Sequence, residues 1–193
     1  MTNNNVSNKV TTMVIAAMLS AVGIIIPMYS PLKIIIEPAS FTLASHVPII
    51  VAMFISPIAA VFVSLVTALG FFLAAIFPPV VVFRALTHVI FAFVGAYILK
   101  KNNKILLSFK SAVPFVLFIS LIHAVCEVAV STIFYFSGQS TANYTVVVIG
   151  LVGLGTVVHS SVDFIIASLI WVPLQHVVSV PTNAKIRLTA AKR

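Results

Sequence analysis

The sequence predicts an all-α integral membrane protein with six transmembrane helices in one bundle. Of the 193 residues, 61% are hydrophobic and only 7% are charged. The mean hydropathy of +1.22 is far above what the core of a soluble domain requires. Apolar stretches of roughly 20 residues, the length of a membrane span, recur along the chain between prolines and short polar segments. We expect a single membrane domain over residues 1–193, without an internal repeat.

The first predicted helix covers about 10–28 and follows a polar start, "MTNNNVSNK". It has no clear small-residue cleavage site, so we interpret it as a retained helix and not as a signal peptide. Residues 31–45, "PLKIIIEPASFTLAS", are amphipathic and interrupted by prolines. This pattern predicts an ordered loop over one face of the membrane.

Prolines also separate the next three predicted helices. A short second helix over 44–55 and a third over 57–76 are divided only by the dipeptide "SP", which predicts a tight break. The proline pair "PP" then precedes a fourth helix over 80–99, which ends at the polar run "KKNNK".

Two long apolar stretches remain in the second half of the chain. A fifth helix is predicted over 111–136, before the polar turn "SGQSTANY". The stretch 145–178 is longer than one perpendicular span of roughly 20 residues. We therefore place the sixth helix at 154–177 and expect "VVVIGLVG" before it to be interfacial or partly helical. The tail after Pro181 is expected to be a short solvated end.

The basic residues predict the orientation in the membrane. With six helices and both termini in the cytoplasm, nine of the eleven lysines and arginines fall on the cytoplasmic side. They are Lys9, Lys100, Lys101, Lys104, Lys110, Lys185, Arg187, Lys192 and Arg193. Such a bias favours this topology and places the loop at 31–45 outside. The formal charge of +8 is therefore a topology signal and does not indicate nucleic-acid binding.

Ionisable side chains lie inside three of these apolar helices, where they are costly unless a partner, water or a ligand compensates them. Three pairs share a four-residue spacing, which puts both members on one helix face. The pairs are Arg84 with His88, His123 with Glu127, and His159 with Asp163. His46 begins the second helix at the same membrane surface. We expect these residues to converge on one outward-facing substrate cavity, covered by the loop that carries Glu37.

Two other interpretations of this cluster stay open. In the first, Arg84 forms a structural ion pair with Glu127 or Asp163, and the histidines are donors between helices. In the second, the histidine and carboxylate spacing reflects zinc or iron ligands of an intramembrane metal-dependent enzyme or a metal-ion carrier. However, Arg84 would repel a divalent cation, and the sequence has no HExxH pattern. We therefore assign no metal ligand and no cofactor.

The sequence contains no motif for catalysis or nucleotide hydrolysis. It has no G-x-S-x-G element and no glycine-rich phosphate loop. Its single cysteine, Cys126, lies within an apolar stretch. We therefore assign no catalytic residue and expect a protein that is not an enzyme.

Small residues form two rows on the first helix. At four-residue spacing these are Ala16 with Ser20 and Ala17 with Ala21. In lipid, helices associate through close packing, so such rows favour contact with another helix, either in the same chain or in a partner. A small carrier without a nucleotide site needs an external source of work for uphill transport, which favours a partner. A self-sufficient secondary transporter is the alternative.

The chain resembles, over nearly its whole length, the substrate-binding S-components of energy-coupling factor (ECF) vitamin transporters. The resemblance rests on Ala17 and Ala21, a long outer loop ending in "FTLASHVP", a short second helix turning at "ISP", the prolines before the fourth helix, and polar residues on the last three helices. It implies an S-component-like bundle in a bacterial plasma membrane that captures a water-soluble vitamin from outside. It also implies docking, through the alanine face, on an ECF module of one transmembrane T-component and two ATPase subunits, and toppling in the membrane to release the vitamin inside.

The stretches "SPLKIIIEPASFTLASHVP" and "VVVFRALTHV" most resemble the nicotinate-type S-components of lactic-acid bacteria and their relatives. The guanidinium of Arg84 suits a vitamin carboxylate, while a histidine or Asp163 could face a ring nitrogen. Pantothenate, also a carboxylate, fits the same logic, with Glu127 and the histidines bonding its hydroxyls and amide. A cationic vitamin such as thiamine would instead recruit the two helix carboxylates. Nicotinate is the favoured ligand.

Overall fold

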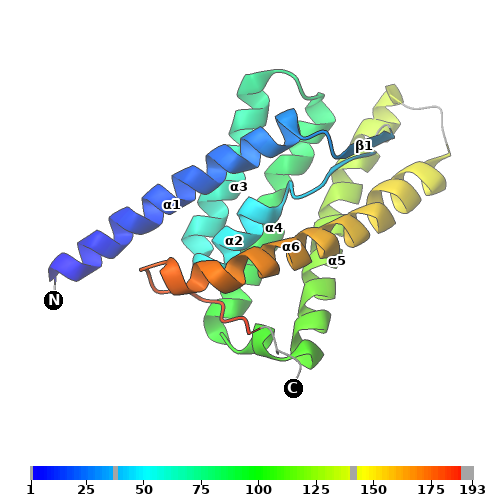
Figure 1. The fold of residues 1–193 in the computed structure, drawn as a ribbon. Coiled ribbons are helices and arrows are strands. Elements are labelled where there is room, and N and C mark those ends of the chain that lie inside the picture. Colours follow the sequence, from blue (N-terminus) through cyan, green and yellow to red (C-terminus); the bar gives the residue numbers. More distant parts are fainter. Residues whose placement is uncertain (1, 37–38, 140–142, 188–193) are drawn as a thin grey trace.

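The computed structural model describes residues 2–36, 39–139 and 143–187, so Glu37 lies outside the described residues. In this part of the chain, six α-helices are accompanied by one small antiparallel sheet and short helical turns (Figure 1). Five stretches are long and apolar enough to cross a membrane: Val6–Tyr29, Pro57–Ala74, Pro79–Lys101, Phe109–Gly138 and Thr145–Val177. The fold is that of an all-α multi-pass membrane protein, and the prediction of a sixth spanning helix is not confirmed.

The helix that falls short of a span is α2 (Val47–Ile55). Its nine residues extend about 14 Å at 1.5 Å per residue, which is less than half of the roughly 30 Å hydrocarbon layer. All nine are buried, and Phe54 packs edge-on against Phe164 and obliquely against Trp171 of α6 (Gly155–Val177). α2 therefore forms the centre of the hydrophobic core.

Helices α1 (Thr2–Tyr29) and α3 (Pro57–Ala74) flank α2. The break between α2 and α3 is as tight as the sequence predicts. Ser56 has extended backbone angles, and its hydroxyl accepts a hydrogen bond from the Ala59 N–H at 3.1 Å, while Pro57 occupies the first turn of α3. A serine N-cap followed by proline fixes the start of a helix, because the serine hydroxyl accepts one of the N–H groups of the first turn and proline has no N–H that needs an acceptor there.

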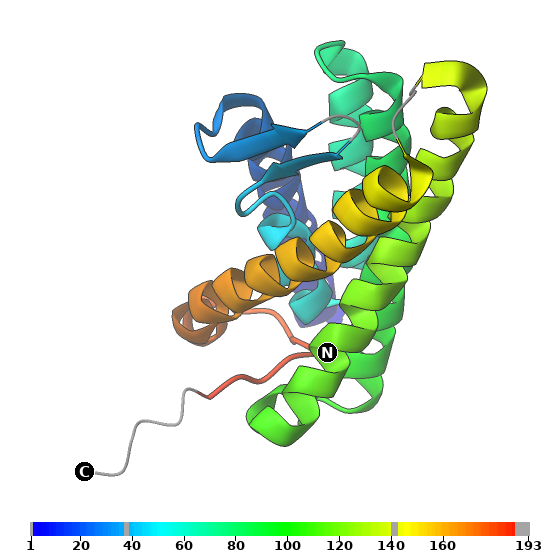
Figure 2. The same ribbon diagram turned by 90° about the vertical axis from the view of Figure 1, so that its right-hand side faces the viewer.

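The remaining spans are α4 (Pro79–Lys101), α5 (Phe109–Phe134) and α6, with a short 3₁₀ turn η1 (Ile105–Leu107) between the first two. Wider π-helical turns, η2 (Tyr135–Gln139) and η3 (Thr145–Leu154), extend α5 and precede α6. The segment before α6 is thus helical, as the sequence predicts in part. Figure 2 shows α6 running obliquely across α5.

The segment between α1 and α2, expected to be an ordered loop, contains a β-hairpin. Strands β1 (Lys33–Ile36) and β2 (Ala39–Thr42) pair antiparallel, with Lys33 opposite Thr42. The hairpin lies across one end of the bundle, near the start of α6 (Figures 1 and 2). The β-branched run before the proline explains the extended conformation.

The described part of the C-terminal segment, which ends at Arg187, does not form the solvated end that the sequence suggests. Between Val178 and Arg187 the chain folds back under α2, and Val180, Ala184 and Ile186 are buried. The N–H groups of Asn183 and Ala184 both donate to the Phe54 carbonyl, at 2.8 and 3.0 Å. The prediction was wrong because the last carbonyls of a helix as short as α2 need partners, and the tail supplies them.

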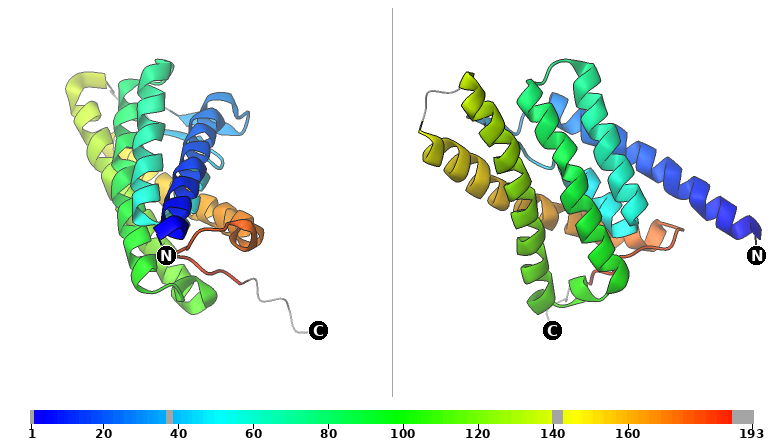
Figure 3. Two further views of the ribbon diagram at one scale, coloured as in Figure 1. Left: turned by 90° about the vertical axis from the view of Figure 1, so that its left-hand side faces the viewer. Right: turned by 180° about the vertical axis from the view of Figure 1, so that it is seen from behind.

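The two ends of the bundle differ in charge. The beginning of α1, the connection between α4 and α5 and the C-terminal segment lie at one end, opposite the hairpin (Figure 3). The basic residues of the described chain at that end are Lys9, Lys100, Lys101, Lys104, Lys110, Lys185 and Arg187. Lys33 lies on the hairpin at the other end.

Candidate binding site

A cavity of about 630 Å³ lies beneath the hairpin, walled by α3, α4, α5 and α6. Its volume is within the range of small-molecule sites. Six of the eight sequence candidates line it: His46, Arg84, His88, His123, Glu127 and His159. The structure therefore confirms that these side chains converge on one hollow, while their contact with a ligand stays a prediction.

Glu127 on α5 is the centre of a buried ionic network. Its Oε2 pairs with the Nε of Arg84 on the neighbouring helix α4. Its Oε1 lies 3.2 Å from His88 Nε2, within hydrogen-bond distance, and 3.4 Å from His123 Nε2, without hydrogen-bond geometry. Arg84 is 6% exposed and Glu127 is 2% exposed. This ion pair offsets the desolvation free energy of the two buried charges, as the interpretation of the cluster as a structural ion pair requires.

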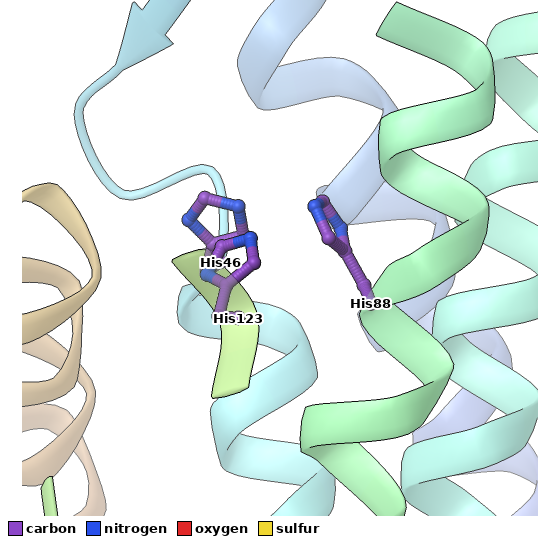
Figure 4. Close-up of side chains that lie close together, drawn as sticks. All are labelled: His46, His88 and His123. Atoms are coloured by element: carbon purple, nitrogen blue, oxygen red, sulfur yellow. The ribbon is translucent and has the colours of Figure 1, made fainter. Parts of the chain in front are cut away.

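Four histidines gather around this network, with His46 in the middle. Its ring centroid lies 4.7 Å from that of His88, 4.6 Å from that of His123 and 5.0 Å from that of His159. Figure 4 shows the rings of His46, His88 and His123 turned toward one another. The three come from the start of α2, from α4 and from α5, so the site exists only when the bundle is assembled.

Asp163 has a different position from the other candidates. It is fully buried on α6 and is not among the residues that line the cavity. Its Oδ1 accepts the Ala44 N–H at 2.8 Å, and its Oδ2 accepts the His46 N–H at 2.9 Å and lies 3.0 Å from His46 Nδ1. Ala44 has a positive φ of 67°, which is unfavourable for alanine. Asp163 therefore holds a strained turn and fixes the His46 ring.

The hairpin covers the cavity through Phe41, whose ring centroid lies 5.4 Å from that of His159. Gly155, in the first turn of α6, permits this approach, because a methyl group there would lie 2.7 Å from Phe41 Cζ. Ser45, between the hairpin and α2, has its hydroxyl 3.2 Å from His159 Nε2. The exposed side chain of Lys33 also borders the cavity.

Three buried hydroxyl groups in the cavity wall were missed by sequence reasoning. They belong to Thr67, Ser131 and Thr156 on α3, α5 and α6, and they have no hydrogen-bond partner among the described residues. Most buried hydroxyls are paired, and Ser64 shows the usual pairing with the carbonyl four residues earlier, at 2.8 Å. Nothing in the sequence separates these two kinds of hydroxyl. These hydroxyls leave hydrogen-bonding capacity in the cavity wall for water or a polar ligand.

The two small-residue rows of α1 face in different directions. Ala16 and Ser20 are buried against the bundle, and the Ser20 hydroxyl donates to the Ala16 carbonyl at 2.8 Å. Ala17 and Ala21 are exposed on the outer side of the helix. Only the second row is therefore available to another protein.

One relative links this architecture to transport. Over 161 residues the chain is 43% identical to the niacin transporter NiaX of Lactococcus lactis subsp. cremoris (strain MG1363). The match covers 82% of this chain and 72% of the relative. No family model and no solved structure matches the chain. The extent of this similarity shows that the chain belongs to the nicotinate-type S-components of energy-coupling factor transporters.

Proposed function

We propose that this chain is the vitamin-binding subunit of an ECF-type importer, that it works without catalysing a reaction, and that its vitamin is nicotinate. The name of its relative, a niacin transporter, supports this assignment. The observation that carries it is a buried guanidinium, Arg84, in the wall of a cavity whose other polar groups are imidazoles, hydroxyls and one carboxylate. Nicotinate offers a carboxylate, a ring nitrogen and an aromatic face, and each has a counterpart there.

In this proposal Arg84 binds the carboxylate of the vitamin. A guanidinium has five N–H donors in a planar fork, and Glu127 engages the one at Nε. A second carboxylate at the fork makes charge-assisted hydrogen bonds, which are about twice as strong as neutral ones. The unpaired hydroxyls of Thr67, Ser131 and Thr156 make hydrogen bonds to the remaining polar atoms of the ligand. Phe41 and Phe71 make apolar contact with its ring.

The other ionisable residues position these groups. Glu127 holds Arg84 and His88, and Asp163 holds His46 and the turn above the cavity. One of the histidines that line the cavity donates an N–H group to the ring nitrogen of the vitamin. His159 links α6 to the loop through Ser45. Glu37, predicted to cover the site, lies outside the described residues and stays a prediction.

We assign the basic end of the bundle to the cytoplasm of a bacterial cell and the hairpin end to the outside, because positive residues concentrate on the cytoplasmic side of membrane proteins. Both termini are then cytoplasmic, and the cavity opens outward. Ala17 and Ala21 dock on the T-component of an ECF module with two ATPase subunits. The buried pair Ala16 and Ser20 instead packs α1 against its own bundle.

Calorimetric titration with nicotinate tests the role of the guanidinium. Arg84→Met is expected to weaken binding at least about 100-fold, or about 2.7 kcal/mol. Because this change strands the Glu127 carboxylate, the double variant Arg84→Met/Glu127→Gln removes both charges and keeps the fold testable. Lys33→Met, at the exposed edge of the cavity, is the control and should bind like the wild type. Unchanged affinity in the double variant would contradict the proposal.

A further inference from the structure

We propose that His46, His88 and His123 form a binding site for a first-row transition-metal dication such as Zn²⁺. Each residue offers one ring nitrogen, and these nitrogens lie within 4.8 Å of one another. Zinc bound at about 2.1 Å in a tetrahedral site holds its ligand atoms about 3.4 Å apart. Small rotations of the three side chains therefore close the site. All three residues are buried, and Figure 4 shows their rings converging.

One ring nitrogen of each histidine has a polar partner, which leaves the other nitrogen as the metal ligand in this proposal. His46 Nδ1 lies 3.0 Å from the Asp163 carboxylate, His88 Nε2 lies 3.2 Å from that of Glu127, and His123 Nδ1 lies 3.3 Å from Ser160 Oγ. Metal-binding histidines characteristically donate their other N–H to such oxygens, which fixes the tautomer and directs the free lone pair at the metal. In this proposal the carboxylates of Asp163 and Glu127 orient the histidines and are not themselves metal ligands.

The orphaned nitrogen of His123 is a separate observation that points to a ligand. Its Nε2 is fully buried and has no hydrogen-bond partner among the described residues. Unpaired buried polar atoms are rare in native proteins. In the tautomer in which Nδ1 donates to Ser160 Oγ, 3.3 Å away, this nitrogen carries a lone pair. Glu127 Oε1 lies 3.4 Å from it without hydrogen-bond geometry, so a metal ion would satisfy the lone pair better than this carboxylate does.

The charges around the cluster also admit a dication. The sequence suggests repulsion by Arg84, but the structure pairs this guanidinium with Glu127. Arg84, Glu127 and Asp163 together carry a formal charge of −1 when the histidines are neutral. A dication changes this sum to +1, and an anionic ligand in the adjoining cavity then makes it zero. Three imidazole ligands leave a fourth tetrahedral position for water or for that anion.

Metal titration of the purified full-length chain, stripped with a chelator, tests this site. We expect one Zn²⁺ per chain by calorimetry, and for Co²⁺ the visible absorption of a tetrahedral complex. His123→Gln and, separately, His88→Gln should weaken Zn²⁺ binding at least about 10-fold, since each removes a ligand. His176→Gln, at an exposed position near the end of α6, is the matched control and should bind like the wild type.

Absence of Zn²⁺ binding by the wild type, or equal affinity in both cluster variants and the wild type, would overturn the metal site. If one cluster variant does not fold, the other decides the question. Nicotinate binding is measured in the same preparations, with chelator present and without added metal. If nicotinate still binds in the presence of chelator and Zn²⁺ does not bind, the metal site is rejected and the vitamin site is kept. Failure of one proposal is therefore distinguishable from failure of the other.

Discussion

Replacing Asp163 with asparagine is expected to loosen the turn above the cavity without changing the shape of the side chain. The carboxylate accepts N–H groups of Ala44 at 2.8 Å and His46 at 2.9 Å, and its Oδ2 faces His46 Nδ1 at 3.0 Å. An amide has only one oxygen. The least costly orientation keeps that oxygen beside His46 and turns the NH₂ group toward the Ala44 N–H, so that two donors face each other.

The magnitude follows from these contacts. A hydrogen bond to a charged group contributes about 1.5–3 kcal/mol, and a buried donor left unpaired costs about 1–3 kcal/mol. Ala44 is only half-buried, which places the second contribution at the low end. We therefore expect Asp163→Asn to lower the free energy of unfolding by about 3 kcal/mol. Nicotinate should also dissociate faster, because His46 and the turn lose their anchor.

Equilibrium unfolding with SDS in mixed detergent micelles measures this change. The matched control is Ser161→Ala on the same helix, whose hydroxyl donates to its own helix at Val157 O and lies 3.3 Å from Ser120 Oγ on α5. That variant should lose less than about 1 kcal/mol. An Asp163→Asn protein whose unfolding free energy stays within about 0.5 kcal/mol of the wild type would refute the reasoning.

Four further predictions follow from other contacts. Ala44→Gly should stabilise the fold by about 1 kcal/mol in the same unfolding titration, because glycine relieves the positive φ; a destabilised variant would refute the strain. Gly155→Ala should displace the Phe41 ring and raise the nicotinate dissociation rate about 10-fold in stopped-flow experiments, about 1.4 kcal/mol; an unaltered rate would show that Phe41 does not close the site. Trp171→Phe removes the indole N–H that donates to Ala184 O at 3.2 Å, and should cost about 1 kcal/mol and expose the tail to protease; a protected tail would contradict this. Ala17→Trp should abolish nicotinate uptake by cells while leaving its affinity unchanged, whereas Leu69→Trp, exposed on α3, should transport normally; normal uptake by Ala17→Trp would exclude docking there.

Helix positions and the convergence of charges could be predicted from the sequence because a bilayer imposes simple demands. Apolar runs must be long enough to span it, and Arg84, Glu127 and their histidines must meet each other because lipid solvates none of them. The four-residue spacing then identifies the helix face. These arguments depend only on composition and spacing, so they hold without knowledge of the packing.

The other features of the fold and the site depend on tertiary contacts, which cannot be inferred from composition or spacing. A core helix such as α2 is as apolar as a span, so its length alone distinguishes the two. Asp163 binds backbone N–H groups, which every residue type carries, and its role as an anchor could not be separated from ligand binding. The tail looked polar enough for solvent, yet its backbone satisfies Phe54 O. The unpaired hydroxyl of Thr67 resembles any other threonine until its neighbours are known.

The most direct test of the central claim compares nicotinate with nicotinamide in calorimetric titrations of the wild-type chain. The two ligands share the pyridine ring and differ in the charge of one substituent. If Arg84 recognises a carboxylate, nicotinate binds one to one and nicotinamide binds at least about 100-fold more weakly, because a neutral amide cannot complete a charge-assisted pair. Equal affinities for the two ligands would contradict the claim that this cavity is built for an anion.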